Sequence, residues 1–465
     1  MNRTVATGVA LAVTLTATAV TLTGGTASAQ GLRHTPHADR HFYTTMTPYT
    51  PQESLSDYQR APKGFTPVFT ENVVRHGARA MTDSSDIDAV MAVVQSAQAQ
   101  GALTGLGAQL GPQVQLLQAA ALSVGYGNLS GLGAQEQQQI ALRLERRLPS
   151  LFSTIVAEQE PIEVETSGVA RAVASANAFT GGLTSGDPAL AGLIQAPVTD
   201  KNLLYFHKQP QNADYQAYLA SDPELAAVLT EIDGEPSTAL AARHVVGRLF
   251  DARFVKAMPT ADQISFSTSL YNLYSAAPDL SVEAPGVDFD PFLSSQDAQW
   301  FAYLDDAAEF YQKGPAFSGR TITYDMANVL LDDLFTQAEA KADGTSDKGA
   351  VLRFTHAEEV IPLAVLLDLP GSTKAADPDQ PYTYQNNPWR GAQVAPMAAN
   401  VQWDLYADPA LGGNGGSSTT AQGTEYLVRM LYNEKETAFK PSCKPIAKGS
   451  YFYDLNELEL CYNQG

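Results

Sequence analysis

Three apolar, β-rich runs that each lead into a polar turn and then a helical pattern set the strongest limit on how this chain folds. The runs cover residues 67–74, 162–166 and 350–355. Strands that alternate with helices indicate an α/β sheet, and in such sheets the functional side chains gather at the carboxyl ends of the strands. We therefore predict that the three turns lie close together.

The first turn reads Arg75-His76-Gly77-Ala78-Arg79 and places two guanidinium groups around one imidazole. A guanidinium presents a planar fork of donors that matches phosphate oxygens, so this pattern indicates phosphoryl chemistry on a histidine nitrogen. Gly77 has no side chain, which leads us to expect a close approach of the backbone to a ligand. The alternative for this segment alone is a surface turn with ordinary basic residues.

The third run leads into His356-Ala357-Glu358. A second histidine could bind a phosphate oxygen, and Glu358 could protonate a leaving alcohol. The alternative is a helix start whose acidic residues complement the helix dipole. A zinc deaminase also begins its signature with His-x-Glu, but it requires a later Pro-Cys-x-x-Cys that this sequence lacks. The zinc protease pattern His-Glu-x-x-His is absent as well.

Together, the Arg-His-Gly-x-Arg and His-Ala-Glu motifs resemble those of the histidine acid phosphatases, in particular the branch that contains the multiple inositol polyphosphate phosphatases. The phytases related to this branch usually carry His-Asp at the second place. The similarity continues through residues 166–183, 328–335 and 400–434, so it spans nearly the whole mature chain. It implies an α/β fold: a histidine-phosphatase-like core sheet with helices on both faces and an inserted, mainly helical cap domain.

The resemblance also implies roles for individual residues. His76 is expected to accept the phosphoryl group, and Glu358 is expected to act first as proton donor and then as the base that activates water. Phosphate-binding roles are implied for Arg75, Arg79, Arg171 and His356. Three arginines and a histidine can neutralise the phosphoryl oxygens without a metal ion, so we expect no metal and no other cofactor.

Ala-, Gln- and Leu-rich stretches with helical spacing fill the intervals between the strand-like runs. We interpret most of them as material inserted into one α/β core, forming a cap over the active edge. The predicted organisation is a signal peptide over 1–29, a catalytic core made of 30–82, 160–185 and 320–465, and a helical cap made of 83–159 and 186–319.

The chain begins with Arg3, an apolar run diluted by threonine, and Ala27-Ser28-Ala29. This order is typical of a secretory signal peptide that is cleaved after Ala29. A membrane anchor is the alternative, but it needs about 20 apolar residues, and this run falls short. We therefore expect a secreted, extracellular protein that does not span a membrane.

The chain carries 29 Lys and Arg against 50 Asp and Glu, a net charge of −21, which becomes about −22 without Arg3. Such a surface repels nucleic acid and anionic lipid, so we expect neither as a partner. A small anionic phosphate monoester then needs a local basic pocket.

Asp83 stands where some phytases carry a lysine, which puts the substrate in question. The candidate cap contacts are Lys201, Lys208, Arg248 and Lys256.

The only two cysteines, Cys443 and Cys461, lie near the C-terminus. In an exported protein such a pair favours a disulfide, worth about 3 kcal/mol for a loop of this size, over two free thiols. The lone histidines His207 and His244 are interpreted as structural or surface residues.

The sequence leaves three functions open. The first is a phosphomonoesterase acting on inositol polyphosphates such as phytate, and the second is a broad-specificity histidine acid phosphatase. The third is a secreted phosphate-binding protein without catalysis, which we disfavour because His76 and Glu358 are both present. The sequence does not fix the oligomeric state, and a monomer is the default expectation.

Overall fold

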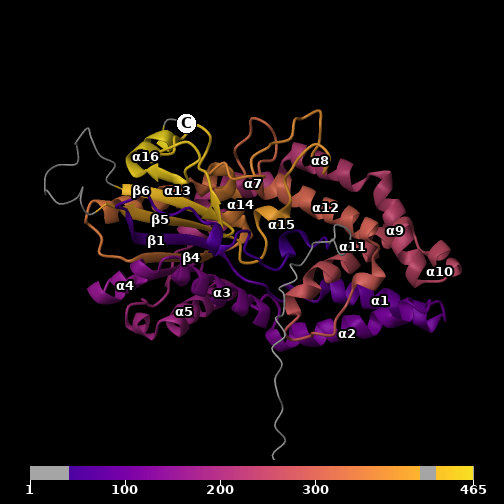
Figure 1. Ribbon diagram of the computed structural model, residues 1–465. Helices are drawn as coiled ribbons and strands as arrows, with labels where there is room; N and C mark the ends of the chain where they lie inside the picture. The colour runs from indigo at the N-terminus through magenta and orange to yellow at the C-terminus, as the bar shows by residue number, and fades with distance from the viewer. Residues whose placement is uncertain (1–40, 409–425, 464–465) are drawn as a thin grey trace, which may run out of the picture. The chain divides into compact units, whose positions relative to one another are not determined.

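One mixed sheet organises the residues that this computed structural model describes, which are 41–408 and 426–463 (Figure 1). The strands in chain order are β1 (Thr66–Arg75), β2 (Ile162–Thr166), β3 (Val198–Thr199), β4 (Ala350–Thr355), β5 (Asn400–Ala407), β6 (Tyr426–Tyr432), β7 (Lys435–Thr437) and β8 (Phe452–Asp454). In the sheet they follow the order β3-β2-β4-β1-β5-β6-β7, and β8 pairs with β6. The three expected strands are confirmed as β1, β2 and β4.

The sheet has a parallel half and an antiparallel half. β3, β2, β4 and β1 run parallel, with Arg75 opposite Thr355 and Thr166 opposite Phe354. β5, β6, β7 and β8 pair antiparallel with their neighbours. Because β2, β4 and β1 are adjacent and parallel, the turns that follow them meet at one edge of the sheet.

Helices make up most of the rest of the described chain. They are α1 (Ser85–Ala99), α2 (Gly107–Val124), α3 (Gly131–Arg147), α4 (Pro149–Glu158), α5 (Ala170–Gly186), α6 (Lys201–Leu204), α7 (Ala213–Ser221), α8 (Pro223–Asp233), α9 (Pro236–Leu249), α10 (Ala252–Ala257), α11 (Thr260–Ala276), α12 (Ser295–Lys313), α13 (Asn328–Ala342), α14 (Ala357–Leu366), α15 (Gly391–Val394) and α16 (Leu455–Asn463). Short 3-10 turns join several of them, including η1 (Thr44–Met46) and η4 (Phe206–Lys208).

Helices cover both faces of the sheet, as expected from the family resemblance. On one face α3, α4 and α5 pack against the strands through a core that includes Ile140 and Phe179. On the other face α13, α14 and α16 pack through Leu334, Leu363 and Leu458. Figure 1 shows the sheet between these two groups of helices.

A second group of helices lies beside the sheet and has its own core. α1, α2, α9, α11 and α12 bury residues such as Val90, Val246 and Leu270 against one another. Figure 1 shows this helical part extending away from the sheet edge. It corresponds to most of the predicted cap, and we keep its function as a cap as a proposal.

The placement of α3 and α4 differs from the prediction that residues 83–159 belong to the cap. Both helices instead pack on the sheet, and α3 approaches α5 closely: a side chain at Gly182 would place its Cβ 2.8 Å from the carbonyl oxygen of Gln138. An apolar helical stripe shows that a helix is buried on one side but not which surface buries it. Residues 131–158 therefore belong with the layered part.

A disulfide joins Cys443 and Cys461, whose Cα atoms lie 5.5 Å apart, in agreement with the sequence prediction. It ties α16 to the segment after β7. The predicted signal peptide over 1–29 lies outside the described residues. Within the described ranges, no helix is both long and apolar enough to cross a membrane.

Candidate active site

The three turns predicted to meet do so at the carboxyl ends of β1, β4 and β2. His76 follows β1 and His356 follows β4, and their ring centroids lie 5.3 Å apart in an edge-on arrangement. Ser167 follows β2, and its Oγ lies 2.8 Å from Nε2 of His356. One residue from each of three adjacent strands thus contributes to a single cluster.

The backbone fixes how His76 carries its proton. Nδ1 of His76 lies 2.9 Å from the carbonyl oxygen of Gly77. A carbonyl oxygen only accepts hydrogen bonds, so Nδ1 must be the protonated nitrogen. In the neutral ring Nε2 then holds a free electron pair, which is the property that a nitrogen nucleophile needs.

Gly77 serves a different purpose from the one expected. A Cβ at this position would lie 2.5 Å from the carbonyl oxygen of Gly133 in α3. The glycine is therefore required by packing against a helix rather than by the approach of a ligand. Its amide is also occupied, because it donates to Oγ of Ser175 at 3.1 Å.

Backbone carbonyl groups hold two of the arginines in place. The buried Arg75 donates from Nη1 to the carbonyl oxygens of Thr45 and Ala395, the latter at 2.6 Å. Arg79 donates from Nη1 to the carbonyl oxygen of Ala80 at 2.9 Å. These bonds orient each guanidinium without neutralising its charge.

Four buried nitrogen atoms of this cluster have no hydrogen-bond partner within the described ranges. They are Nε of Arg75, Nε of Arg79, Nε of Arg171 and Nδ1 of His356. A buried donor without a partner is energetically unfavourable, and most are paired in folded proteins. Four of them in one cluster, three on cations, indicate a place for an anion with several oxygen acceptors.

The same charges keep both histidines neutral. Burial first of all, and then the positive charge of Arg75, hold the pKa of His76 well below its ordinary value of 6.5. Burial and Arg171 lower the pKa of His356 to about 3. Burial, reinforced by Arg75 and Arg171, lowers the pKa of Arg79 to about 10. The arginines thus remain charged at neutral pH, while the imidazoles are free bases.

Two consecutive carboxylates at the start of α14 have different surroundings. Glu359 is fully buried, where it accepts a hydrogen bond from the hydroxyl of Thr355 at 3.0 Å and contacts Nδ1 of His207 at 2.5 Å. Glu358 is 29% exposed and pairs with Lys313 at 3.2 Å. Glu358 is therefore the carboxylate within reach of a ligand, and Glu359 is structural.

Comparison with known families agrees with the motifs and with the geometry. Residues 69–433 match the Histidine phosphatase superfamily (branch 2). The chain belongs to this family. The matched region runs from β1 to the end of β6, and it includes both motifs and the helices that cover them.

Among curated proteins, this histidine phosphatase is similar to human multiple inositol polyphosphate phosphatase 1. The two are 25% identical over 356 residues, which cover 71% of this chain and 65% of the human protein. The aligned part of the chain thus spans slightly less than two thirds of that relative.

Among solved structures, multiple inositol polyphosphate phosphatase from Bifidobacterium longum has a similar fold. Its complex with phosphate superposes with a TM-score of 0.84 at 31% identity, covering 91% of this chain and 97% of that one. Its complex with inositol hexasulfate gives a TM-score of 0.82 with the same coverage. A phytase from D. castellii, at 15% identity and a TM-score of 0.63, shares the fold.

Several residues of the cluster escaped the sequence analysis. Ser167 carries no sequence motif that marks it, although its Oγ contacts His356. Lys313 and Glu309 lie in α12, and no motif marks them. Only the strand order and the position of α12 relative to α14 reveal these contacts.

The four candidate cap contacts fall into two groups. Lys201 and Lys208 are exposed and flank Tyr205, whose ring centroid lies 5.2 Å from that of His356. Arg248 lies in the last turn of α9 and donates to the carbonyl oxygen of Pro291, and Lys256 lies in α10. Figure 1 shows α10 at the end of the helical part that is remote from the sheet. The sequence shows that these four residues are charged, but it does not show which surface each side chain faces.

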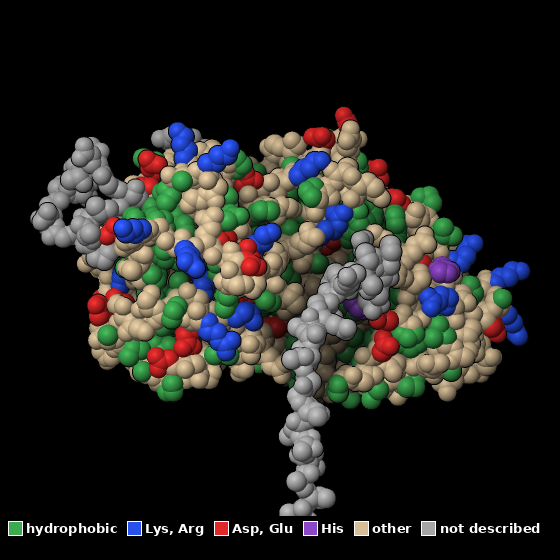
Figure 2. Space-filling model, viewed as in Figure 1, with side chains coloured by type: hydrophobic (Ala, Val, Ile, Leu, Met, Phe, Trp, Pro, Cys, Tyr) green, Lys and Arg blue, Asp and Glu red, His purple; other side chains and the backbone are tan. Residues whose placement is uncertain are grey.

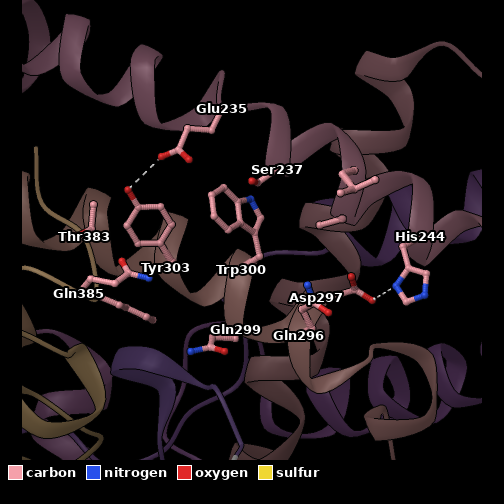
Figure 3. A pocket seen from close by; sticks show the side chains of 13 residues that line it. Glu235, Ser237, His244, Gln296, Asp297, Gln299, Trp300, Tyr303, Thr383 and Gln385 are labelled. Atoms are coloured by element: carbon pink, nitrogen blue, oxygen red, sulfur yellow. Dashed lines mark hydrogen bonds and ion pairs between the residues drawn. The ribbon is translucent and has the colours of Figure 1, made fainter.

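A hollow of about 580 Å³ lies elsewhere, between α9, α12 and the segment around Tyr384 (Figure 3). Glu235 and Asp297 line it, and its lining includes no Lys or Arg among the described residues. Figure 3 shows Asp297 paired with His244 and Glu235 facing Tyr303. Two carboxylates and no lysine or arginine disfavour an anionic ligand, so the strand-end cluster is the better candidate for phosphate.

Proposed function

We propose that this protein is a phosphomonoesterase that transfers the phosphoryl group of its substrate to His76. The observation that carries the proposal is the set of four unpaired nitrogen atoms around a neutral imidazole whose Nε2 is free. Arg75, Arg79 and Arg171 would bind the phosphoryl oxygens together with His356. Phosphoryl transfer requires in-line positioning and charge neutralisation above all, and these groups supply both without a metal ion.

The reaction would take two steps. Nε2 of His76 attacks phosphorus, the bond from phosphorus to the ester oxygen breaks, and Glu358 gives its proton to the leaving alkoxide. Glu358, now ionised, then takes a proton from water as that water attacks phosphorus and the bond to His76 breaks. The products are an alcohol and inorganic phosphate, and the enzyme returns to its starting state.

Ser167 would orient the ring of His356 for this role. If the serine hydroxyl donates to Nε2, the proton of the neutral ring resides on Nδ1, the nitrogen without a partner. Nδ1 can then donate to a phosphoryl oxygen. Tyr205 packs against the rings of His207 and His356, which restricts the orientation of His356.

Inositol polyphosphates such as phytate are the substrates we propose. The names of the human and Bifidobacterium relatives, and the binding of inositol hexasulfate by the latter, support this class. The face shown in Figure 2 has basic side chains interspersed with acidic ones and no continuous basic surface. Additional phosphates would therefore need specific residues near the cleft, and Lys201 and Lys208 are the candidates we retain.

A broad-specificity acid phosphatase is the second candidate, favoured by Asp83, which is exposed and accepts hydrogen bonds from Ser85.

We also propose secretion, supported by the pattern of residues 1–29 and by the disulfide between Cys443 and Cys461. The helical part containing α1, α2 and α9 to α12 is proposed to act as the cap.

The proposal is tested by phosphate release from inositol hexakisphosphate and from p-nitrophenyl phosphate, both with chelator present. We expect activity on both and an acid-labile phosphoenzyme after rapid quench, neither of which His76→Ala should show. Activity that chelation removes and zinc or magnesium restores would overturn the mechanism. If Lys201→Ala and Lys208→Ala leave the Michaelis constant for the hexakisphosphate unchanged, and monophosphates are hydrolysed at least as well, the substrate class is wrong.

A further inference from the structure

The candidate acid, Glu358, has a cationic partner that belongs to the helical part of the molecule. Lys313 is the last residue of α12, and its Nζ lies 3.2 Å from Oε1 of Glu358 at the start of α14. The Lys313 side chain is 15% exposed, so water screens this pair only partly. α12 thus supplies a positive charge to a residue that follows a core strand.

Lys313 is shared with a second carboxylate. One helical turn earlier, Glu309 lies 2.7 and 2.9 Å from Nζ of Lys313 through its two carboxylate oxygens. Glu309 is 17% exposed, so both members of this pair are largely withdrawn from solvent. The ammonium therefore divides its interaction between a closer carboxylate on its own helix and a more distant one in the candidate active site.

Several other titratable groups interact electrostatically with Glu358. They are Arg75 in β1, Arg79 after β1, Arg171 in α5, His207 in η4, Tyr215 in α7, His356 before α14 and Glu359 in α14. The three arginines carry the positive charge expected to meet a phosphate. Within the described residues, Lys313 is the only group that forms an ion pair with Glu358.

This arrangement conflicts with the first step of the proposed reaction unless the pairing changes. Burial alone would raise the pKa of Glu358, but opposing positive charge, that of Lys313 first of all, outweighs burial and holds the pKa well below 4.5. A proton donor must carry a proton, whereas the unliganded site favours the carboxylate. A bound phosphate ester adds negative charge close to Glu358, which favours protonation from solvent.

We propose that Lys313 is a positioning residue that keeps Glu358 ionised until substrate binds, and that Glu309 limits the strength of this effect. The inference rests on the proposed function, because it concerns the acid of that reaction. α12 thereby sets the pH above which Glu358 no longer serves as a donor in the first step. The proton that Glu358 acquires comes from solvent and passes to the leaving oxygen. Glu358 takes a second proton from the attacking water and returns it to solvent when phosphate leaves, so the unliganded enzyme is again ionised at this position.

Two substitutions should shift the pH profile in opposite directions. Lys313→Met removes an opposite charge a few ångströms from Glu358, so the alkaline limb of kcat/KM for glycerol 2-phosphate should move up by about 1 to 3 pH units. Glu309→Gln leaves Lys313 with one carboxylate, so that limb should move down. A purely structural role would weaken the fold in both variants without opposite shifts.

The measurement is the pH dependence of kcat/KM for glycerol 2-phosphate and, in parallel, for p-nitrophenyl phosphate. The second substrate needs little protonation of its leaving group, so its profile should not follow the limb seen with the first. Comparing variants on the same substrate cancels the ionisation of the substrate itself. Lys313→Arg keeps the charge and should keep the limb near its wild-type position.

Lys341→Met is a matched control, because this lysine is similarly buried and pairs with Glu160 at the opposite end of the sheet strands. The alkaline limb of the Lys341→Met variant should not move.

The proposal would be overturned if the limb is unshifted in both Lys313→Met and Glu309→Gln, or if it shifts in the same direction in both. Glu309→Gln retains the lysine, so it tests the idea even if Lys313→Met fails to fold. Loss of the phosphoenzyme and of p-nitrophenyl phosphate turnover in wild type would instead refute the proposed function.

Discussion

Binding of inorganic phosphate tests directly whether the arginines at the strand ends form an anion site. Phosphate that binds the folded protein but not the unfolded chain raises the free energy of unfolding. At a concentration of 100 times its Kd the increase is about 2.7 kcal/mol, which for a folded part of this size corresponds to about 3 °C in Tm.

Arg171→Met should reduce that response by an amount that follows from the geometry. Nε of Arg171 is buried and has no partner within the described residues, so the arginine is free to bond the anion. A hydrogen bond to a charged group contributes about 1.5 to 3 kcal/mol, so the Kd should rise roughly 10- to 150-fold. At the same phosphate concentration the gain then falls to about 0.3 to 1.3 kcal/mol, or about half of the wild-type Tm shift at most.

The assay is thermal unfolding at several phosphate concentrations, with sodium chloride at matched ionic strength beside it. Arg248→Met is the control, because Arg248 donates to the carbonyl oxygen of Pro291 away from the strand ends. It should respond as wild type does. A phosphate shift of equal size in Arg171→Met and wild type would refute the reasoning, since the unpaired nitrogen atoms would then not bind the anion.

Two further outcomes follow from the same geometry. Glu358→Gln should slow hydrolysis of alkyl phosphates far more than hydrolysis of p-nitrophenyl phosphate, which steady-state rates on both substrates would measure; equal slowing would place the acid elsewhere. Ser167→Ala removes the partner of Nε2 of His356, which should weaken phosphate binding by about 1 kcal/mol, or roughly fivefold in Kd by calorimetry. An unchanged Kd would show that Ser167 does not orient the ring.

Local patterns predicted the parts of the fold and site that depend on neighbours in sequence. β2 and β4 begin and end at the expected residues, and the turn motifs after β1 and β4 converge as expected. A strong β pattern that ends in a short polar turn defines where a strand begins and ends. Because the strands are adjacent and parallel, the turns that follow them then lie at the same edge of the sheet.

The parts that could not be predicted depend on distant surfaces. Lys313 meets Glu358 across 45 residues of sequence, and nothing around Lys313 distinguishes it from other helical lysines. α3 and α4 bury one apolar side, as the cap helices do, yet they pack on the sheet. In each case the sequence shows that a side chain is apolar or charged, and only the tertiary arrangement determines its partner.

Most of the buried arginines outside the cluster are neutralised by carboxylates. Arg353 is fully buried and lies 2.9 Å from Glu71. Arg429 lies 3.0 Å from Asp404. Removing one partner of such a pair leaves a buried charge uncompensated and destabilises a fold by about 3 to 5 kcal/mol. The charge of these arginines is therefore committed to the fold and is not available to a ligand.

The arginines at the strand ends are held differently. Arg75 donates to the carbonyl oxygens of Thr45 and Ala395, and Arg79 donates to that of Ala80. Carbonyl groups fix the direction of a guanidinium but carry no net charge, so the positive charge stays available to an incoming anion. In a chain with 50 acidic residues, holding these arginines by carbonyl groups would leave positive charge for the proposed phosphate site. From the net charge of the protein we therefore expect extended polyanions to be repelled, while a small phosphate ester can still bind where these arginines lie.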